Sequence, residues 1–289
     1  MDRRPHADVA PGVQRLAVRT PTLAPATETN SYLVGERDFV LVEPATPYAD
    51  TQAELFAHLD ARVAARHRFV ATLATHHHGD HVGAAEAVVA RYGVPLAAHP
   101  ETARRLHGVV AVTMPCEDGD GRLAAALGMD LALLHTPGHA PGHLVLHART
   151  DGWTIAGDMV STLSTIIVDP DDGGDMEAYV TQLRRMAALG PTRLLPAHGD
   201  PADDGVALLE AYVRHREGRE AKILGAVAAG ADTLDAVVER AYDDTPPFVW
   251  PIAARSALAH LRRLEARGAV TAFDGDAEQR WKLRETTNP

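Results

Sequence analysis

Four histidines and an aspartate fall within the six positions 76–81, directly after a short apolar run. Imidazole nitrogens and carboxylate oxygens are common ligands of zinc, iron and manganese. Because alternate side chains of an extended chain leave on the same side, His76 and His78 can face one ion. Asp80 and His81 can then diverge toward a second ion. These residue types and this spacing predict a metal centre instead of a chance polar turn.

Three further candidate ligands lie far downstream, each just after a predicted strand. His139 lies in a Thr-Pro-Gly-His turn, Asp158 follows the apolar run 153–156, and His198 lies in a Pro-Ala-His-Gly turn. The ends of strands in layered α/β folds are where binding sites usually form. We therefore expect these three side chains to meet the segment 76–81.

The elements that must position these residues alternate between strands and helices. Apolar runs bounded by turns predict strands at 31–34, 39–42, 69–74, 131–134, 143–147, 153–156 and 194–195. Apolar residues at helical spacing predict helices at 47–66, 83–91 and 176–189. This order predicts an α/β fold in which two sheets pack face to face and helices flank them.

The pattern changes after position 201. Helical spacing predicts helices at about 207–229, 234–242 and 252–267, and two short strands follow at 268–273 and 279–283. Helices followed by a small hairpin are typical of a winged helix. We therefore predict two domains, a large one at 1–205 and a winged-helix domain at 206–289.

Composition limits the partners and the compartment. The 289 residues carry a formal net charge of −11, which disfavours nucleic acid as a partner without excluding it. No apolar run approaches the roughly 20 residues of a membrane span. The single cysteine, Cys116, cannot form an intramolecular disulfide, and no apolar signal segment follows the first residues. We expect a cytoplasmic protein with no membrane partner.

The candidate ligands together resemble the signature of the metallo-β-lactamase superfamily, which reads H-x-H-x-D-H and then H, D and H at long spacings. The resemblance implies a four-layer αββα metallo-β-lactamase sandwich. It also implies two metal ions, the first held by His76, His78 and His139 and the second by Asp80, His81 and His198. The same resemblance gives Asp158 the role of bridging both ions.

The resemblance extends from about residue 21 to residue 283 and is closest to the beta-lactamase-like protein 2 branch. The segments that carry it are 29–35, 157–160, 215–220 and 259–264. This branch implies a C-terminal winged helix, and its relatives include an endoribonuclease and thioester hydrolases. Two departures stand out, because Glu43-Pro44-Ala45 replaces the usual Asp-x-Gly and Gly83-Ala84 replaces Gly-Gly.

The residues and the resemblance together predict a metal-dependent hydrolase. Two divalent ions, with Zn²⁺ favoured and iron or manganese open, would share a hydroxide that attacks an ester-like bond. Asp158 would bridge the ions and Asp80 would also orient the hydroxide, so these two are the predicted catalytic residues. We favour a small-molecule or carrier-bound thioester, of the acyl-CoA or acyl-carrier type, as the substrate.

Three other functions stay open. The first is an endoribonuclease that cleaves phosphodiesters. The second is a hydroxyacylglutathione hydrolase like glyoxalase II, whose metal loop also reads THHH-x-DH. The third is no enzyme at all but a winged-helix nucleic-acid-binding module, which would have no reason to retain all seven ligands.

A few residues and the oligomeric state are left without a firm assignment. His77 occupies a variable position, and His143 could line the pocket or serve a structural role. Arg262, Arg263 and Arg267 are predicted to lie on the solvent-facing side of the last helix. A homodimer is also possible.

Overall fold

The computed structural model describes residues 6–275 and 279–284. The packing of the chain divides it into two compact units, which we call the first and the second unit. The first unit comprises Met1–Thr136, Pro141–Ile166 and Met186–Leu208. The second comprises Pro137–Ala140, Ile167–Arg185 and Leu209–Pro289. The domain boundaries 1–205 and 206–289 stay a prediction.

The first unit contains a seven-stranded sheet in the order β1 to β7. Strands β1 to β4 are antiparallel, and β4 to β7 are parallel. Their bounds are β1 His6–Ala10, β2 Val13–Arg19, β3 Glu28–Val34, β4 Asp38–Val42, β5 Arg68–Leu73, β6 Leu96–Ala98 and β7 Met114–Pro115. The parallel half places the end of β5, where the segment with the candidate ligands begins, in the interior of the sheet.

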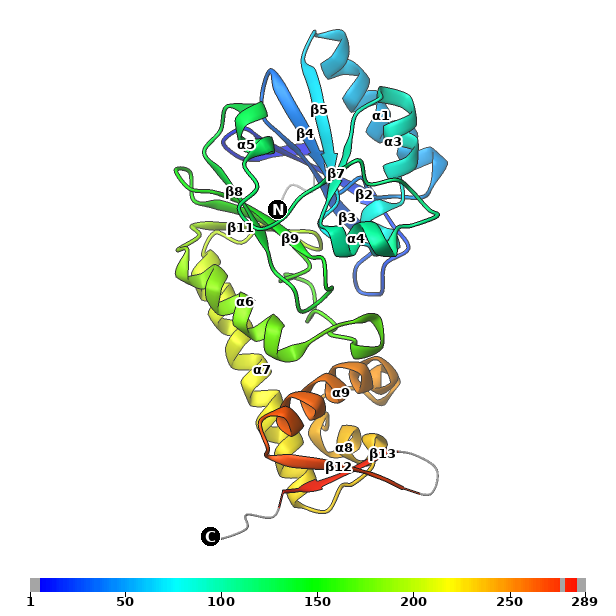
Figure 1. Ribbon diagram of the computed structural model, residues 1–289, viewed down its shortest axis with the longest axis vertical. Helices are drawn as coiled ribbons and strands as arrows, with labels where there is room; N and C mark the ends of the chain where they lie inside the picture. The colour runs from blue at the N-terminus through cyan, green and yellow to red at the C-terminus, as the bar shows by residue number, and fades with distance from the viewer. Residues whose placement is uncertain (1–5, 276–278, 285–289) are drawn as a thin grey trace. The chain divides into compact units, whose positions relative to one another are not determined.

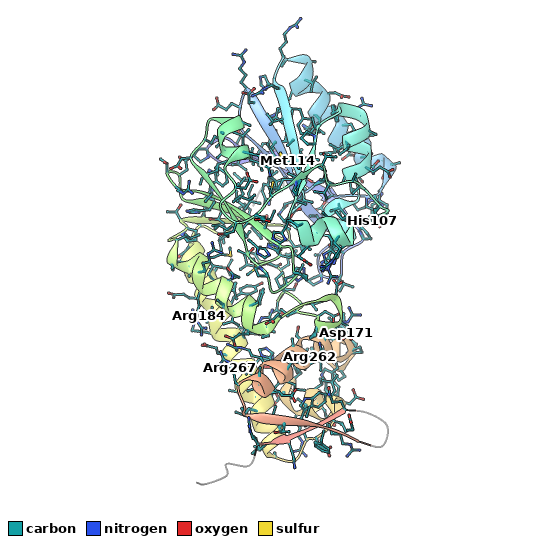
Figure 2. The ribbon with its side chains drawn as sticks, viewed as in Figure 1. His107, Met114, Asp171, Arg184, Arg262 and Arg267 are labelled. Carbon is teal, nitrogen blue, oxygen red and sulfur yellow. The ribbon has the colours of Figure 1, made fainter. Side chains whose placement is uncertain are left out.

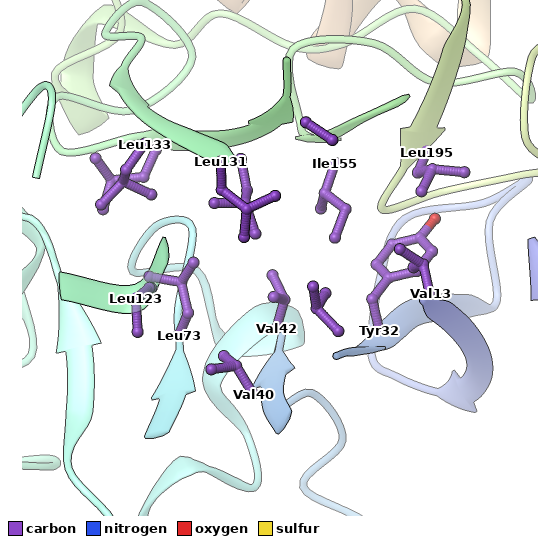
Figure 3. Close-up of a cluster of buried hydrophobic side chains, with 14 of the residues drawn as sticks. Val13, Tyr32, Val40, Val42, Leu73, Leu123, Leu131, Leu133, Ile155 and Leu195 are labelled. Carbon is purple, nitrogen blue, oxygen red and sulfur yellow. The ribbon is translucent and has the colours of Figure 1, made fainter. Parts of the chain in front are cut away.

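A four-stranded sheet in the order β11, β10, β9 and β8 also belongs to the first unit. Only the β10–β11 pair is parallel. The bounds are β8 Leu131–His135, β9 Leu144–Ala148, β10 Trp153–Gly157 and β11 Arg193–Pro196. Figure 3 shows the side chains of the two sheets facing each other, with Val42 and Leu73 opposite Leu131 and Ile155. This dry layer joins the sheets and fixes the strand ends that carry the candidate ligands.

Helices cover the other face of the seven-stranded sheet. In α1 (Ala49–Ala64), Leu55 and Leu59 are buried one turn apart, and Val88 of α3 (Ala85–Tyr92) packs in the same cluster. They contact the outward side chains Leu33 and Leu41 of β3 and β4. Figure 1 shows both helices beside β4 and β5. Three shorter helices complete the unit, α2 (Gly79–Val82), α4 (Pro100–Arg105) and α5 (Arg122–Leu127).

The second unit contains the predicted winged helix and most of α6 and α7. Its elements are α6 Met176–Ala188, α7 Gly205–Ala228, α8 Leu234–Ala241, α9 Trp250–Ala266, β12 Val270–Asp274 and β13 Gln279–Leu283, with 3-10 turns at Pro170–Asp172 and Pro247–Val249. Strands β12 and β13 form an antiparallel hairpin. Ile223, Val237, Leu261 and Trp281 are buried together, so α7, α8, α9 and the hairpin share one core.

The prediction for Arg263 is wrong, because its side chain is only 2% exposed. It lies 2.8 Å from Glu177 Oε2 and 2.7 Å from Glu220 Oε2, so two carboxylates from other helices compensate its burial. Arg262 and Arg267 are about half exposed, as predicted. Figure 2 shows both at the second unit, with Asp171 nearby.

The fold class is otherwise as predicted, and each strand predicted from residue 31 to residue 195 overlaps a strand of the structure. Strands β1, β2, β6 and β7 were not predicted. Among the described residues, no helix combines the length and the apolar character that crossing a membrane requires.

Candidate metal centre

The segment 76–81 leaves the end of β5 as extended chain and then turns into α2. His78 still has extended backbone angles (φ −65°, ψ 145°), and the helical turn starts with the next residue. His76 and His78 therefore point the same way, and their Nε2 and Nδ1 atoms lie 2.9 Å apart. The turn of α2 redirects Asp80 and His81 toward a different point.

A second group of ligand atoms gathers around His81 and His198. His81 Nε2 lies 3.7 Å from Asp80 Oδ1 and 3.6 Å from Asp158 Oδ2. His198 Nε2 lies 3.5 Å from Asp80 Oδ2 and 3.5 Å from Asp158 Oδ1. These distances are too long for hydrogen bonds. Two ligands about 2.1 Å from one tetrahedral ion lie roughly 3.4 Å apart, so the four groups have the spacing of metal ligands.

The burial of His81 supports the same conclusion. Its side chain is fully buried, and Nε2 has no hydrogen-bond partner among the described residues. An unsatisfied buried polar atom costs about 1–3 kcal/mol, and such atoms are rare in folded proteins. A cation coordinated by this nitrogen and its two carboxylate neighbours would remove that cost. The residues present therefore fit a divalent metal ion.

Strand β3 holds the loop that carries His198. Asn30 of β3 donates from Nδ2 to the carbonyls of Pro196 and Gly199, at 2.9 and 2.7 Å. His198 pairs through Nδ1 with the carbonyl of Glu28 at 3.0 Å. Because a carbonyl only accepts, Nδ1 carries the proton and Nε2 presents its lone pair to the carboxylates.

Glu43 orients two histidines, His81 through a close contact and His76 through Thr75. This buried residue accepts a hydrogen bond from the Thr75 hydroxyl at Oε1 (2.6 Å), and the same oxygen lies 3.1 Å from His81 Nδ1. The Thr75 oxygen is also 2.9 Å from His76 Nδ1. Since the only hydroxyl proton points to Glu43, His76 Nδ1 must donate to Thr75. Both histidines are thereby held with Nε2 as the atom available for a metal.

A family model described as the metallo-beta-lactamase superfamily matches residues 24–198, more than half of the 289 residues. The chain belongs to the metallo-beta-lactamase superfamily. A second model, the beta-lactamase associated winged helix domain, matches residues 233–281. Both parts of the predicted resemblance are confirmed.

Relatives of this superfamily member match nearly its whole length. Beta-lactamase-like protein 2 homolog from Drosophila melanogaster is 28% identical over 273 residues, covering 90% of this chain and 89% of the relative. Atrochrysone carboxyl ACP thioesterase from Aspergillus chevalieri is 27% identical, covering 83% and 76%. A β-lactamase domain protein from Burkholderia ambifaria has a TM-score of 0.80 at 21% identity, covering 96% and 93%. That last likeness shows the fold.

The electrostatics of this superfamily site favour positive charge. Burial on its own lowers the pKa of His81, but Asp80, Glu43 and Asp158 outweigh burial and raise that pKa well above its ordinary value. Burial likewise raises the pKa of Asp80, and the facing imidazoles of His81 and His198 outweigh it and lower that pKa. The carboxylates attract positive charge, which either a proton on the histidines or a metal ion can supply. Protons and metal ions must therefore compete for this site.

His143, whose role the sequence left open, holds the backbone of Asp158. Its Nε2 accepts the Asp158 N–H at 3.0 Å, and its Nδ1 pairs with Thr136 Oγ1 at 2.8 Å. A Cβ at Gly157 would come within 2.5 Å of His143 Nε2, so this close approach requires glycine. The fully buried His143 therefore fixes the residue predicted to bridge the ions.

The remaining predicted ligand, His139, belongs to the second unit. The residue is 8% exposed, and its Nδ1 donates to the Ile167 carbonyl at 2.8 Å, so Nε2 is its candidate ligand atom. Gly138 has φ +141°, and a Cβ there would lie 2.3 Å from Tyr179 Cα. The assignment of His139 to the same ion as His76 and His78 stays a prediction. His77 is half-buried, and its role stays open.

Sequence reasoning identified the replacement at Glu43 but not what the side chain does. It also missed Thr75, which links Glu43 to His76. The signal was present, because a threonine directly before the first candidate ligand, His76, is well placed to bond its ring. Which partner that hydroxyl chooses depends on Glu43, 32 residues earlier in the chain.

Proposed function

We propose that this superfamily hydrolase works with two divalent metal ions. The proposed ligands are His76, His78 and His139 for one ion and Asp80, His81 and His198 for the other, with Asp158 shared. The observation that carries the proposal is the arrangement of the His81 and His198 Nε2 atoms, each 3.5–3.7 Å from both Asp80 and Asp158. Imidazole and carboxylate ligands favour zinc, and iron and manganese accept the same set.

Bound metal ions would act as Lewis acids that lower the pKa of water and stabilise negative charge on the substrate. The protein supplies the geometry and the proton acceptor. Asp80 and Asp158 are held between the two imidazoles, and Asp80 is the more exposed carboxylate, at 17% against 10%. Asp80 is therefore placed to orient a water and to take its proton toward solvent.

We propose an acyl thioester, either small or carried by a protein, as the substrate. One relative of similar length is named as a thioesterase that acts on an acyl carrier protein. Such a substrate is compatible with the net charge of −11. A long RNA would need many cationic contacts on an acidic protein.

The test is a comparison of kcat/KM for acyl-CoA and acyl-carrier thioesters, hydroxyacylglutathione and single-stranded RNA, each at 50 and 200 mM salt. We expect thioester turnover that depends little on salt. Asp158→Asn should reduce kcat by about 10²-fold or more, because the shared carboxylate is lost. His77→Ala is the matched control in the same loop, with an expected change of less than about threefold.

Other outcomes would reject this substrate assignment. RNA cleavage that falls steeply with salt and no thioester turnover would show a nuclease. Turnover confined to hydroxyacylglutathione would show a glyoxalase II-like enzyme. Nucleic-acid binding by a chain that hydrolyses none of these substrates would favour a winged-helix binding module.

A further inference from the structure

One peptide group in the second unit, between Ile167 and Val168, is held at both ends. Its carbonyl oxygen accepts a hydrogen bond from His139 Nδ1 at 2.8 Å. Its N–H donates to Ser256 Oγ of α9 at 3.2 Å. Ser256 is 7% exposed and Val168 is fully buried, so water does not replace these contacts easily.

The planar geometry of a peptide lets a contact at its N–H fix the direction of its carbonyl. A trans peptide is planar, and its C=O and N–H point in opposite directions. Fixing the N–H therefore fixes the direction of the carbonyl on the other side. An N–H that donates also polarises its own carbonyl, which becomes a better acceptor for the imidazole.

We propose that Ser256 is a positioning residue for His139 and acts through the Ile167–Val168 peptide. Its hydroxyl oxygen holds the peptide, and the peptide carbonyl holds the His139 ring with the proton on Nδ1. Nε2 then has the fixed direction and the lone pair that a metal ligand needs. The proposal rests on the proposed function in giving His139 a metal, and the contacts from His139 to Ser256 of α9 all lie within the second unit.

Further contacts tie the same segment to α9. Arg255, next to Ser256, lies 3.1 Å from Asp169 Oδ2, directly after the held peptide. Arg263 lies 2.8 Å from Glu177 Oε2, at the start of α6. The Asp175 N–H donates at 2.8 Å to the carbonyl of residue 138, the neighbour of His139. The turn that bears His139 is thus connected to α9 by several neighbouring contacts, and the Ser256 contact is the one that leads through the Ile167–Val168 peptide to the imidazole.

The direct test uses metal-free protein labelled with ¹⁵N-histidine. In the wild type, NMR should show His139 protonated at Nδ1, with a slowly exchanging proton assigned by its loss in His139→Gln. Ser256→Ala should speed the exchange of that proton at least tenfold or shift the ring toward the other tautomer. Ser256→Thr retains the hydroxyl and should keep the wild-type signal. Arg255→Ala, which breaks only an exposed ion pair, is the matched control and should also keep it.

A metal titration then tests the consequence for binding. Ser256→Ala should weaken one of the bound ions by about tenfold, as loss of a partner behind a ligating histidine usually does. In a His139→Gln background the same substitution should have no further effect, because its effect passes through His139. An unchanged Nδ1 signal in Ser256→Ala, or an equal loss of affinity in both backgrounds, would overturn the proposal. A wild type that binds no metal would reject the proposed function, and the NMR comparison would still decide the role of Ser256.

Discussion

Glu43 Oε1 lies 3.1 Å from His81 Nδ1 in the interior of the protein, and neither side chain is exposed to solvent. The same oxygen accepts the Thr75 hydroxyl, which in turn accepts from His76 Nδ1. One carboxylate therefore determines the orientation of two candidate ligands. Glu43 adopts a positive φ of +60°, which is uncommon for a residue other than glycine.

Removal of this carboxylate should weaken metal binding. We expect Glu43→Ala to lower zinc affinity by about 10- to 100-fold, because His81 and His76 lose the partner that orients their rings. Glu43→Gln keeps an oxygen for Thr75 but loses the charge, so its zinc affinity should lie between those of the wild type and Glu43→Ala. Competition with a chromophoric chelator measures all three. A folded Glu43→Ala protein with wild-type affinity would show that Glu43 does not support the site.

His143 should support the site through the hydrogen bond that its Nε2 accepts from Asp158. His143→Leu removes the acceptor of the Asp158 N–H and the contact with Thr136, which should cost about 1–3 kcal/mol of unfolding free energy. It should also weaken the ion bound to Asp158 by about tenfold. His143→Gln offers a side-chain oxygen and should recover most of both losses. Urea unfolding and chelator competition measure both effects. Equal losses in His143→Leu and His143→Gln would contradict this role.

Metal binding should release protons and strengthen as the pH rises. In the metal-free protein the Asp80, Glu43 and Asp158 carboxylates outweigh burial and raise the pKa of His81 well above its ordinary value, which favours the protonated ring. A metal ion must displace that proton, and affinity should therefore fall on acidification. Calorimetry in buffers of different ionisation enthalpy should give about one proton or more released per chain at pH 7. Binding without proton release would contradict the raised pKa.

Arg263 should stabilise the second unit much more than its neighbour Arg262. Arg263→Met leaves the Glu220 carboxylate, which is 13% exposed, without its closest cation, and this should cost about 3 kcal/mol at pH 7. Arg262 is 51% exposed and 3.5 Å from Asp171, so Arg262→Met should cost less than about 0.5 kcal/mol. Urea unfolding of both variants measures the difference. Equal losses would show that the burial of Arg263 has no energetic weight.

The pH dependence of the unfolding free energy is a second test of the role of Arg263. The Arg263 guanidinium lowers the pKa of Glu177, and together with His260 it outweighs burial and lowers the pKa of Glu220. A carboxyl group whose pKa is lower in the folded than in the unfolded state stabilises the fold at pH values above its unfolded-state pKa. This stability is lost as the pH falls through the pKa of the folded state. The wild type should therefore lose stability on acidification below about pH 4.5, and Arg263→Met should lose less.

The candidate ligands could be predicted because their pattern is local. The closely spaced histidines and aspartate at 76–81 mark one loop, and the strand before it follows from a short apolar run. Strand β2 was missed because Gln14 and Arg15 interrupt its alternation. Arg263 was misplaced because its partners, Glu177 and Glu220, lie 86 and 43 residues away and on other helices. Helical periodicity alone cannot show that an arginine has two such partners.

The residues that support the ligands were harder to predict than the ligands themselves. Glu43, His143 and Ser256 each act on a residue that is distant in sequence, and each does so by one or two hydrogen bonds or close contacts. Such contacts leave no periodic pattern, because they depend on where two separate elements meet in the fold. Only the structure shows which of the four serines and sixteen histidines has that position.

Metal content tests the central claim most directly. Purified chain, loaded with zinc and dialysed, should retain about two equivalents of metal by elemental analysis, as two-metal sites do. Asp158→Ala should retain about one, because the shared carboxylate is lost, and His77→Ala should retain both. A wild-type chain that holds no zinc, or one equivalent that Asp158→Ala leaves unchanged, would contradict a shared two-metal site.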